Sequence, residues 1–504
     1  MSTKSYWIDS ASAPRFAKLD RNLTVDVVII GAGITGITTG YLLKKAGHTV
    51  AILERGTCAS ADTGHTTAHL TCVTDLRLAE LAKNFGPKSA RAVWDAGRAA
   101  IDQIHSNIEA EEISCQFRWV DGFLHTPLRK KTVDPKDRRE VMLDAALAQK
   151  LGFDAEYVNS VPFMDRPGMR VPNQALFHPR KYTSALLHKI HGEGSHIFEH
   201  TAAVEITDKP LSVKAAGNRI SCQYVVLATN TPLMGKTSLV SATLFQTKLS
   251  LYTSYVVGAR LPQGTVPEAS YWDIDDPYYY LRIDRRRGFD YAVFGGQDHK
   301  TGQEEDTSKP FQRLEKMFHQ LMPKGVIDHR WSGQVIVTND GLPYIGETAE
   351  KQFAATGYCG NGMTFATVAA MICRDKLAGR KNPWADLFSV KRRKIKGGTL
   401  EYLKENADYP YYLVRDRLAK AEGESVADLA PGEGKILSLD GKKVAAYRDK
   451  KGKVTQCSPV CPHLYCIVGW NTAEKTWDCP CHGSRFKPTG EVIAGPAEAP
   501  LEKL

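Results

Sequence analysis

The first long apolar stretch of the chain, VDVVIIGAGITGITTGYLLKKAGHTVAILERG, predicts a strand, a helix and a second strand. Residues 25–30 are apolar except for Asp26, which is typical of a strand buried in a parallel sheet. The helix is expected to extend to about Ala46 and to end at Gly47, because glycine readily adopts the left-handed conformation that caps helices. A second apolar run, residues 49–53, predicts the next parallel strand.

The hydrophobic pattern changes twice along the chain. Strand-like and helix-like segments alternate from about residue 20 to residue 390, which predicts an α/β domain. A basic, helix-tending connector follows at 391–424. Beyond it, Asp440-Gly441 and Lys451-Gly452 separate runs of alternating apolar residues, the pattern of β-hairpins. Residues 425–504 are therefore predicted to form a separate, small all-β domain.

Composition and charge narrow the functional classes. The 504 residues are 42% hydrophobic and 24% charged, which is ordinary for a globular protein. The net charge of +10 comes from basic residues interleaved with acidic ones, so we expect no nucleic-acid partner. No apolar run reaches membrane-spanning length, and the first residues lack the pattern of a secretory signal. We therefore expect no membrane span and a cytoplasmic location.

The connector contains a short basic run. Its members are Lys391, Arg392, Arg393, Lys394 and Lys396. Such a run is usually a solvated face, and a docking patch for an acidic redox partner is the alternative.

Three glycines after the first predicted strand indicate a dinucleotide site. Gly31 allows a tight turn, Gly33 lets the backbone approach a pyrophosphate, and Gly36 permits close packing of helix on strand. Glu54 ends the second strand, where its carboxylate can accept hydrogen bonds from ribose hydroxyls. The residues expected to bind the dinucleotide here are Gly31, Ala32, Gly33, Ile34, Thr35, Gly36, Glu54 and Arg55.

Later segments specify the dinucleotide by resemblance. They are ADTGHTTAHL at 61–70, HTAAVEI at 200–206, YVVLATN at 224–230, TNDGLPYIG at 338–346 and ATGYCGNGMT at 355–364. In this order they resemble the cofactor-binding segments of the D-amino acid oxidase (DAO) superfamily, with Asn230 where that family usually has glycine. The resemblance implies FAD, bound through Gly64, His65, Thr66, Thr67, Val204, Ala228, Thr229, Gly357, Gly360, Asn361, Gly362, Met363 and Thr364.

The same resemblance implies how the first 390 residues are divided. FAD-binding segments are expected at about 22–75, 195–235 and 331–390. A substrate domain with an antiparallel sheet over the flavin is expected at about 76–194 and 236–330. His65 is a candidate for covalent flavin attachment, and a simple hydrogen bond to the cofactor is the commoner role.

Five of the eleven cysteines crowd into residues 457–481. Cys461-x-His463 and Cys479-x-x-His482 supply two thiolates and two imidazoles. A zinc site accepts the same ligand types, but the flanking HGS and the β-rich context resemble the Rieske family. That resemblance implies a [2Fe-2S] cluster held by these four residues. The expected fold is thus a DAO-like α/β FAD-binding Rossmann-like domain with an antiparallel substrate sheet, followed by an all-β Rieske domain.

Other residues of the motif refine the resemblance. Cys466 and Cys481 occupy the positions that a disulfide joins in the cytochrome bc-complex branch of the Rieske family; two free thiols are the alternative. Ser484 matches a serine that donates to a bridging sulfide, and Tyr465 replaces a usual glycine. Phe486 stands where high-potential members carry a tyrosine, so we expect a potential below the top of the roughly −150 to +300 mV Rieske range.

A cluster of histidines offers a competing metal site. HKIHGEGSHIFEH contains His188, His191, His196, Glu199 and His200, and Rieske oxygenases bind mononuclear iron through two histidines and a carboxylate. The segment is better explained as a helix, a glycine turn and a strand, which separates the histidines onto two elements.

The region 230–335 is rich in aromatic residues and is expected to bind the substrate. Arg282 is a candidate clamp for a substrate carboxylate, and a buried arginine that ties strands together is the alternative. Tyr255 and His65 are further candidate catalytic residues, and aromatic rings here can also cage a cationic amine.

The resemblance as a whole implies a flavin-dependent dehydrogenase acting on a C–N bond of an amine or amino acid. Electrons would leave the reduced flavin one at a time through the Rieske cluster to an external acceptor protein. Two alternatives remain open: a reductase in which an external donor supplies the cluster and the flavin reduces a substrate, and a non-catalytic electron-transfer or redox-sensing module.

Overall fold

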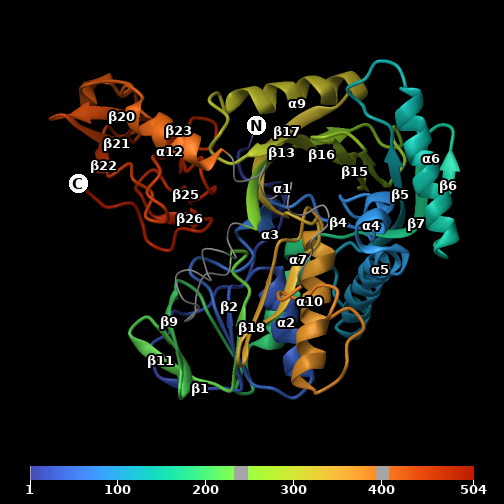
Figure 1. Ribbon diagram of the computed structural model, residues 1–504, viewed down its shortest axis with the longest axis horizontal. Helices are drawn as coiled ribbons and strands as arrows, with labels where there is room; N and C mark the ends of the chain where they lie inside the picture. The colour runs from blue at the N-terminus through green and yellow to red at the C-terminus, as the bar shows by residue number, and fades with distance from the viewer. Residues whose placement is uncertain (1, 232–247, 393–407) are drawn as a thin grey trace.

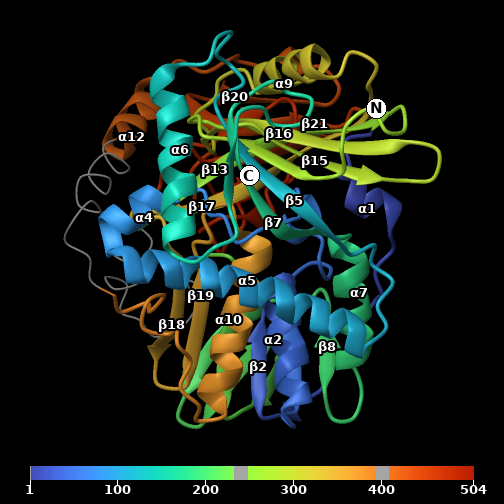
Figure 2. The same cartoon turned by 90° about the vertical axis from the view of Figure 1, so that its right-hand side faces the viewer.

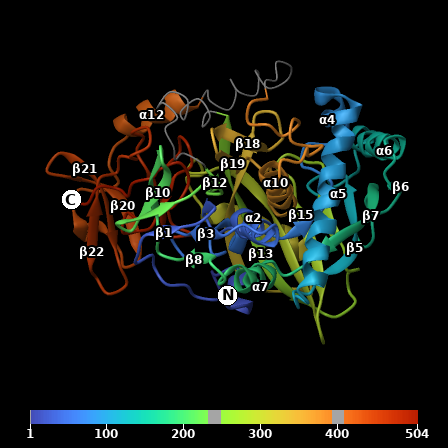
Figure 3. The ribbon, with the colours of Figure 1, turned by 90° about the horizontal axis from the view of Figure 1, so that it is seen from below.

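The computed structural model describes residues 2–231, 248–392 and 408–504. Within these ranges the strands form five sheets, three before the connector and two after it. Figures 1 and 3 show the C-terminal part, from α12 (Tyr409–Leu418) onward, gathered at one end of the molecule. Among the residues described, none of the helices combines the length and apolar character that crossing a membrane requires.

A six-stranded sheet contains the predicted βαβ unit. Its strands pair in parallel except for the edge strand β18, which is antiparallel to β19. Both β2 and β3 are buried along their whole length, as their apolar runs predict, so the expected strand–helix–strand order is confirmed. In spatial order the strands are β18 (Tyr344–Ala349), β19 (Gln352–Thr356), β12 (Tyr224–Leu227), β2 (Val27–Ile30), β3 (Val50–Leu53) and β8 (His196–Phe198).

Helices cover one face of this sheet and a small sheet covers the other. Helices α2 and α10 pack side by side on the first face, where Figures 1 and 2 show them as neighbours. The close approach of α2 to the turn after β2 depends on Gly36, because a Cβ there would lie 1.9 Å from the Gly31 carbonyl oxygen. The covering elements are α2 (Ile34–Lys45), α7 (Pro179–Ile190), α10 (Gly362–Leu377), β1 (Leu23–Thr24), β9 (Ala203–Asp208), β10 (Leu211–Ala215) and β11 (Asn218–Ser221).

The residues before the connector, called here the first part, form two halves. The six-stranded sheet is the centre of one half, and a nine-stranded, largely antiparallel sheet forms the other. The strands are, in order, β17 (Val326–Thr338), β13 (Leu249–Leu261), β16 (Asp290–Lys300), β15 (Tyr280–Arg285), β14 (Ser270–Asp273), β5 (Arg118–His125), β7 (Gly168–Leu176) and β4 (His69–Leu70), with β6 (Glu156–Val158) paired to β7. Around it lie α1 (Tyr6–Ser10), α3 (Asp62–His65), α4 (Leu78–Phe85), α5 (Pro87–Ala110), α6 (Pro135–Lys150) and α9 (Ser308–Leu321).

The period of two along β13 gives this sheet two different faces. Ser254 and Val256 point toward the six-stranded half, whereas Tyr255 and Val257 pack in a separate core beneath α9. Figure 2 shows α9 lying over β13 and β16 on that far side. The nine-stranded sheet therefore presents one face to a space between the two halves and closes the other with a helix.

The C-terminal part is built of β-strands, as predicted, and these form two small antiparallel sheets. The turns at Asp440-Gly441 and Lys451-Gly452 connect the three strands of the first sheet. Three of the five residues in the connector's basic run lie outside the described ranges, namely Arg393, Lys394 and Lys396. The elements are η1 (Val426–Asp428), β20 (Glu433–Leu439), β21 (Lys442–Arg448), β22 (Val454–Cys457), β23 (Gly469–Asn471), β24 (Thr476–Asp478), β25 (Arg485–Phe486) and β26 (Val492–Ala494).

The C-terminal part contacts both the loop after β16 of the nine-stranded sheet and the segment after β12 of the six-stranded sheet. Gln303 donates to the Pro480 carbonyl at 3.0 Å, and Thr231 donates to the Gly495 carbonyl at 3.1 Å. Gly302 has φ +82°, and a Cβ there would lie 2.7 Å from the Cys479 carbonyl carbon. Backbone thus meets backbone at this contact, which requires glycine.

Candidate active site and cluster site

A cavity of about 590 Å³ lies between the two halves of the first part. At one end, the turn after β2 leads into α2, whose N-cap Gly33 has no side chain, although the Ile34 amide donates to Thr63 Oγ1 at 2.9 Å. Glu54, at the end of β3, accepts hydrogen bonds from the amides of Ala32 at 2.9 Å and Gly56 at 2.7 Å. A helix N-terminus beside a glycine turn and a carboxylate is the arrangement that a dinucleotide pyrophosphate and ribose require, so this end fits FAD.

Most residues expected to bind FAD line this cavity. They are Gly31, Ala32, Gly33, Ile34, Thr35, Glu54, Arg55, His65, Thr66, Thr67, Val204, Ala228, Thr229, Gly360, Asn361, Gly362 and Met363. Gly36, Gly64, Gly357 and Thr364 lie behind the wall instead. A Cβ at Gly64 would lie 2.8 Å from the Ala59 carbonyl oxygen, and one at Gly357 would lie 2.3 Å from Thr338 Cγ2, so these glycines serve close packing.

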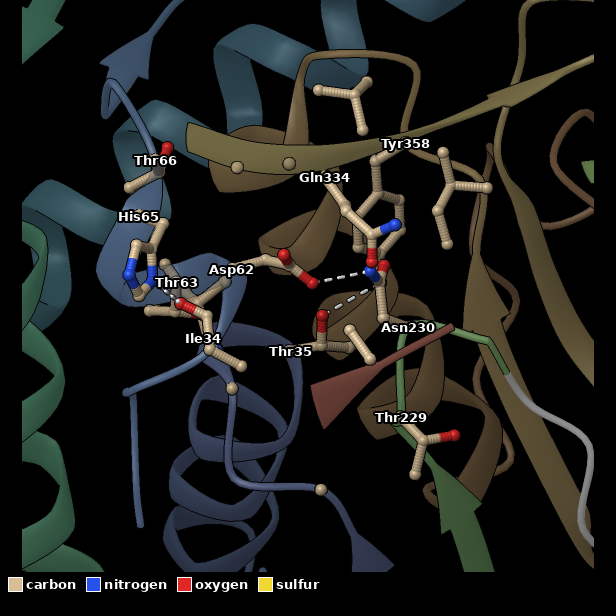
Figure 4. A pocket seen from close by; sticks show the side chains of 18 of the residues that line it. Ile34, Thr35, Asp62, Thr63, His65, Thr66, Thr229, Asn230, Gln334 and Tyr358 are labelled. Atoms are coloured by element: carbon tan, nitrogen blue, oxygen red, sulfur yellow. Dashed lines mark hydrogen bonds between the residues drawn. The ribbon is translucent and has the colours of Figure 1, made fainter. Parts of the chain in front are cut away.

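Two hydrogen-bonded pairs of polar side chains lie in the middle of the cavity, and three of the four residues, Asp62, Asn230 and Tyr358, were not among those predicted to bind the cofactor. Asn230 Nδ2 donates to Asp62 Oδ2 at 2.7 Å, and Thr35 and Tyr358 share a hydrogen bond of 3.0 Å, both drawn in Figure 4. Burial raises the pKa of Asp62, although His65 and Asn230 act against this. Asn230 has φ +65°, which explains why asparagine can replace the glycine of the family at this position. That departure from the family pattern was the available signal.

The far end of the cavity is acidic and aromatic. Asp75 accepts a hydrogen bond from the Tyr278 hydroxyl at 2.8 Å, and Asp298 accepts one from Ser254 at 2.5 Å. Ser254 also shares a 2.6 Å hydrogen bond with the Tyr280 hydroxyl. Trp272 and His69 complete the wall, with the His69 ring 6.0 Å from that of Tyr280 and 6.3 Å from that of Trp272.

Within the described part of the chain, the two carboxylates at this end have no cationic partner. Neither Asp75 nor Asp298 forms an ion pair among the described residues, and Arg55 is the sole lysine or arginine of the described part that lines the cavity. Loss of hydration within the cavity walls raises the pKa of both carboxyl groups to about 7. Burial lowers the pKa of His69 to about 4, so its imidazole is neutral and does not compensate them.

Arg282 is not at the cavity. It is fully buried in β15, where Nε and Nη2 donate to the Asp284 carboxylate at 3.0 and 2.6 Å. Nη1 donates to the Ala68 carbonyl at 2.7 Å, and Nη2 to the Phe177 carbonyl at 3.1 Å. Because Nη1 also donates to the Thr67 carbonyl at 3.3 Å, all five N–H groups of the guanidinium are used and no donor is left for a substrate carboxylate. Of the two roles considered for Arg282, the packing matches the one in which it ties strands together.

The other two candidate catalytic residues, Tyr255 and His65, lie in different places. Tyr255 lies in the core beneath α9, where its hydroxyl contacts His299 Nε2 at 3.0 Å, so it does not face the cavity. His65 does line the cavity, and its Nδ1 lies 2.9 Å from the Ala61 carbonyl. Only His65 of the three is thus placed to contact a cofactor.

Replacing Arg282 with methionine is expected to destabilise the fold by about 1–3 kcal/mol, because the buried carbonyl oxygens of Ala68 and Phe177 lose their donor, while Asp284 keeps Arg118 as a cationic partner. Urea unfolding measures the change, and the exposed Arg287→Met variant is the control. If the Arg282→Met variant keeps its stability and loses substrate affinity instead, Arg282 binds the substrate carboxylate and the structural role is wrong.

The predicted cluster ligands converge in two loops of the C-terminal part. The rings of His463 and His482 have centroids 5.0 Å apart. A hydrogen bond from the Cys479 thiol to the Cys461 sulfur lowers the pKa of Cys461. His482 Nδ1 is buried without a hydrogen-bond partner among the described residues, as a metal-binding nitrogen requires. Burial lowers the pKa of both histidines to about 4, so both imidazoles are neutral. These four side chains fit a Rieske cluster.

The surroundings of the ligands match the same class. Cys466 and Cys481 form a disulfide between the two loops, with Cα atoms 6.5 Å apart. The buried Ser484 hydroxyl lies near Cys461 and accepts from the Ala497 amide at 3.0 Å. Glu199 of the histidine-rich segment instead accepts from the backbone amide of Cys58 at 2.7 Å. The predicted helix and strand place that segment's histidines on two elements, although the ring centroids of His191 and His196 lie 6.4 Å apart across the turn.

A dinucleotide cavity and a two-cysteine, two-histidine loop pair together define a flavin- and Rieske-containing oxidoreductase. The family model for FAD-dependent oxidoreductases (DAO) matches residues 26–375, and that for the Rieske [2Fe-2S] domain matches residues 422–504. The chain belongs to the DAO family of FAD-dependent oxidoreductases and carries a C-terminal Rieske domain, so its cofactors are FAD and a [2Fe-2S] cluster.

Three relatives illustrate this membership. YhfW of Bacillus subtilis (strain 168), whose name describes a Rieske 2Fe-2S iron-sulfur protein, is 33% identical over 99% of this chain and 97% of its own. Gamma-glutamylputrescine oxidoreductase of Escherichia coli (strain K12) is 24% identical over 82% of this chain and 99% of its own. The structure of glycine oxidase from Geobacillus kaustophilus superposes with a TM-score of 0.62 at 16% identity, covering 74% of this chain and 99% of that one.

Proposed function

We propose that the protein is a dehydrogenase that oxidises a C–N bond of an amine lacking a carboxylate and passes the electrons one at a time to an external acceptor. When bound, FAD supplies a two-electron acceptor and the Rieske cluster a one-electron carrier. The observation that carries the choice of substrate is the pair of uncompensated carboxylates, Asp75 and Asp298, among aromatic rings at one end of the cavity.

These side chains suit a positively charged group. A substrate ammonium would supply the positive charge that neither carboxylate finds in the described structure, and the rings of Trp272, Tyr278 and Tyr280 offer faces to its methylene groups. The Tyr278 and Ser254 hydroxyls hold the two carboxylates in place by hydrogen bonds. The substrate would thus be oriented by charge at one end, leaving a second, neutral amine to react at the flavin.

An amino acid suits this end of the cavity less well. A substrate carboxylate would stand near Asp75 and Asp298 with no described arginine or lysine to bind it, and like charges in a confined site repel strongly. The names of the relatives do not decide between an amine and an amino acid, since glycine oxidase is named for an amino acid and gamma-glutamylputrescine oxidoreductase for a compound that has a free amine and also the carboxylate of its glutamyl group. The cavity's charge therefore supports the amine.

A matched pair of compounds tests the proposal. Under anaerobic conditions we expect 1,5-diaminopentane to bleach the flavin and lysine, which differs by one carboxylate, to do so at least about tenfold less efficiently. We would measure the rate at which the absorbance of the oxidised flavin at about 450 nm is lost. A preference for lysine would contradict the amine assignment. If dithionite bleaches the flavin and no amine or amino acid does, the reverse reaction, reduction of a substrate by the flavin, becomes the better account.

A further inference from the structure

Gln334 lies between the flavin cavity and the loop of the Rieske domain that holds two cluster ligands, while residues 493–495 and 497–499 of the same domain line the cavity directly. It belongs to β17, is 8% exposed, and lines the middle of the cavity, where Figure 4 shows it close to Asn230 and Tyr358. Its opposite neighbour is the cluster loop, defined here as residues 479–483, which includes two cluster ligands. A single side chain therefore contacts both compartments.

The contacts of Gln334 are divided between these compartments. Its Nε2 donates to the carbonyl oxygen of Gly483 at 2.8 Å and approaches Thr301 Oγ1 at 3.1 Å. Gly483 directly follows the cluster ligand His482 in the chain. The Oε1 of Gln334 is buried and has no hydrogen-bond partner among the described residues, so it remains available to a donor in the cavity.

The cluster loop has little freedom to move away from this contact. Gly483 has φ +72°, and a Cβ there would lie 2.7 Å from Leu251 Cβ. The Pro480 carbonyl of the same loop accepts from Gln303 at 3.0 Å, and Gln303 also donates to Asp408 at 2.8 Å. The loop is thus held on the surface of the nine-stranded sheet at both of its ends, and of the two glutamines that bond to it Gln334, unlike Gln303, lines the cavity.

We propose that Gln334 is a positioning residue that fixes the cluster loop against the flavin cavity and connects the two redox centres by a continuous path of covalent and hydrogen bonds. The path runs from the Gln334 side chain through the Gly483 carbonyl to the backbone of His482. Each transfer removes one electron from the reduced flavin and adds it to the oxidised cluster, and the external acceptor then reoxidises the cluster. This inference rests on the electron flow of the proposed function, but not on the identity of the substrate.

The test compares two glutamine variants of the full-length protein containing both cofactors. Gln334→Met keeps the length of the side chain and removes both hydrogen bonds to the far side of the wall. Gln303→Met is the matched control, since it also removes a hydrogen bond to the cluster loop but does not line the cavity. The flavin is reduced by light with EDTA as electron donor, so the test needs no substrate.

We expect Gln334→Met to slow the appearance of the reduced-cluster EPR signal about tenfold, which is the size of effect typical of changes to groups just outside metal ligands. Gln303→Met should change the rate of its appearance less than about twofold. The EPR line shape of the dithionite-reduced cluster should be the same in both variants. Faster amide hydrogen exchange in residues 479–484 of Gln334→Met, measured also without the cluster, would report the lost anchor. An unchanged rate in Gln334→Met, or an equal slowing in Gln303→Met, would overturn the proposal. No light-driven cluster reduction in the unmodified protein would instead overturn the electron flow of the proposed function.

Discussion

Replacing His482 with alanine is expected to leave bleaching of the flavin by substrate unchanged while abolishing reduction of a one-electron acceptor. His482 contributes one of two imidazoles to the cluster site, and its buried Nδ1 has no other use among the described residues. Loss of a ligand should cost more than the roughly 10- to 100-fold typical of changes outside the ligand shell. Stopped-flow absorbance of the flavin and steady-state reduction of a ferricyanide-type acceptor measure the two steps.

The control for this prediction is His188→Ala, which removes an exposed histidine of α7. Flavin content and the urea midpoint of both variants show whether the fold is intact. Acceptor reduction that persists in a folded His482→Ala protein without iron would remove the cluster from the electron path.

The second large effect is expected at the acidic end of the cavity. Replacing Asp298 with asparagine keeps the shape of the side chain and removes its charge, so kcat/KM for a diamine should fall by the equivalent of about 2–5 kcal/mol, or tens- to thousands-fold. Asp75→Asn should act in the same direction. Asp276, whose exposed side chain lies beside this region without lining the cavity, provides the control variant Asp276→Asn.

The same carboxylates give the binding site a defined pH dependence. Both have a pKa raised to about 7, so each is largely protonated at pH 6 and ionised at pH 8. Tetramethylammonium does not titrate, and its affinity, read from the shift of the flavin spectrum, should therefore rise with pH through 7 and then level off. The facing groups do not interfere, because His69 is neutral and the pKa of Tyr278, Tyr280 and Cys359 is raised by burial. Affinity that is flat from pH 6 to 8, or that is unchanged in Asp298→Asn, would contradict the assignment.

The parts of the fold that the sequence predicted are those encoded locally. The first strand, helix and second strand follow from two apolar runs and three glycines within 30 residues, and the ligands Cys461, His463, Cys479 and His482 lie within 22 residues of one another. Their spacing is set by turn geometry, which a short motif specifies. Long-range partners are not needed to recognise either site.

The prediction for Arg282 shows where local reasoning stops. Strand alternation places Arg282 on the same face as Tyr280, which does line the cavity. The sequence could not reveal that the backbone of residues 67–68, more than 200 positions earlier, takes the donors of this guanidinium. Asp284, two residues away, was the available signal of a structural ion pair.

The acidic end of the cavity was not predictable for a similar reason. Asp75 and Asp298 come from segments more than 200 residues apart, and each alone has the pattern of a surface residue. The contact of Gln334 with Gly483 joins two domains across 149 positions and leaves no motif in either segment. Only the assembled structure brings these groups together.

The most direct test of the central claim follows electrons from an amine to the cluster. Protein with both cofactors oxidised is mixed anaerobically with 1,5-diaminopentane and frozen at successive times, and flavin absorbance and the reduced-cluster EPR signal are recorded in parallel. The account predicts that the flavin bleaches and that the reduced-cluster signal grows with it in the absence of any other reductant. Bleaching of the flavin while the cluster stays oxidised, in protein whose cluster dithionite readily reduces, would contradict it.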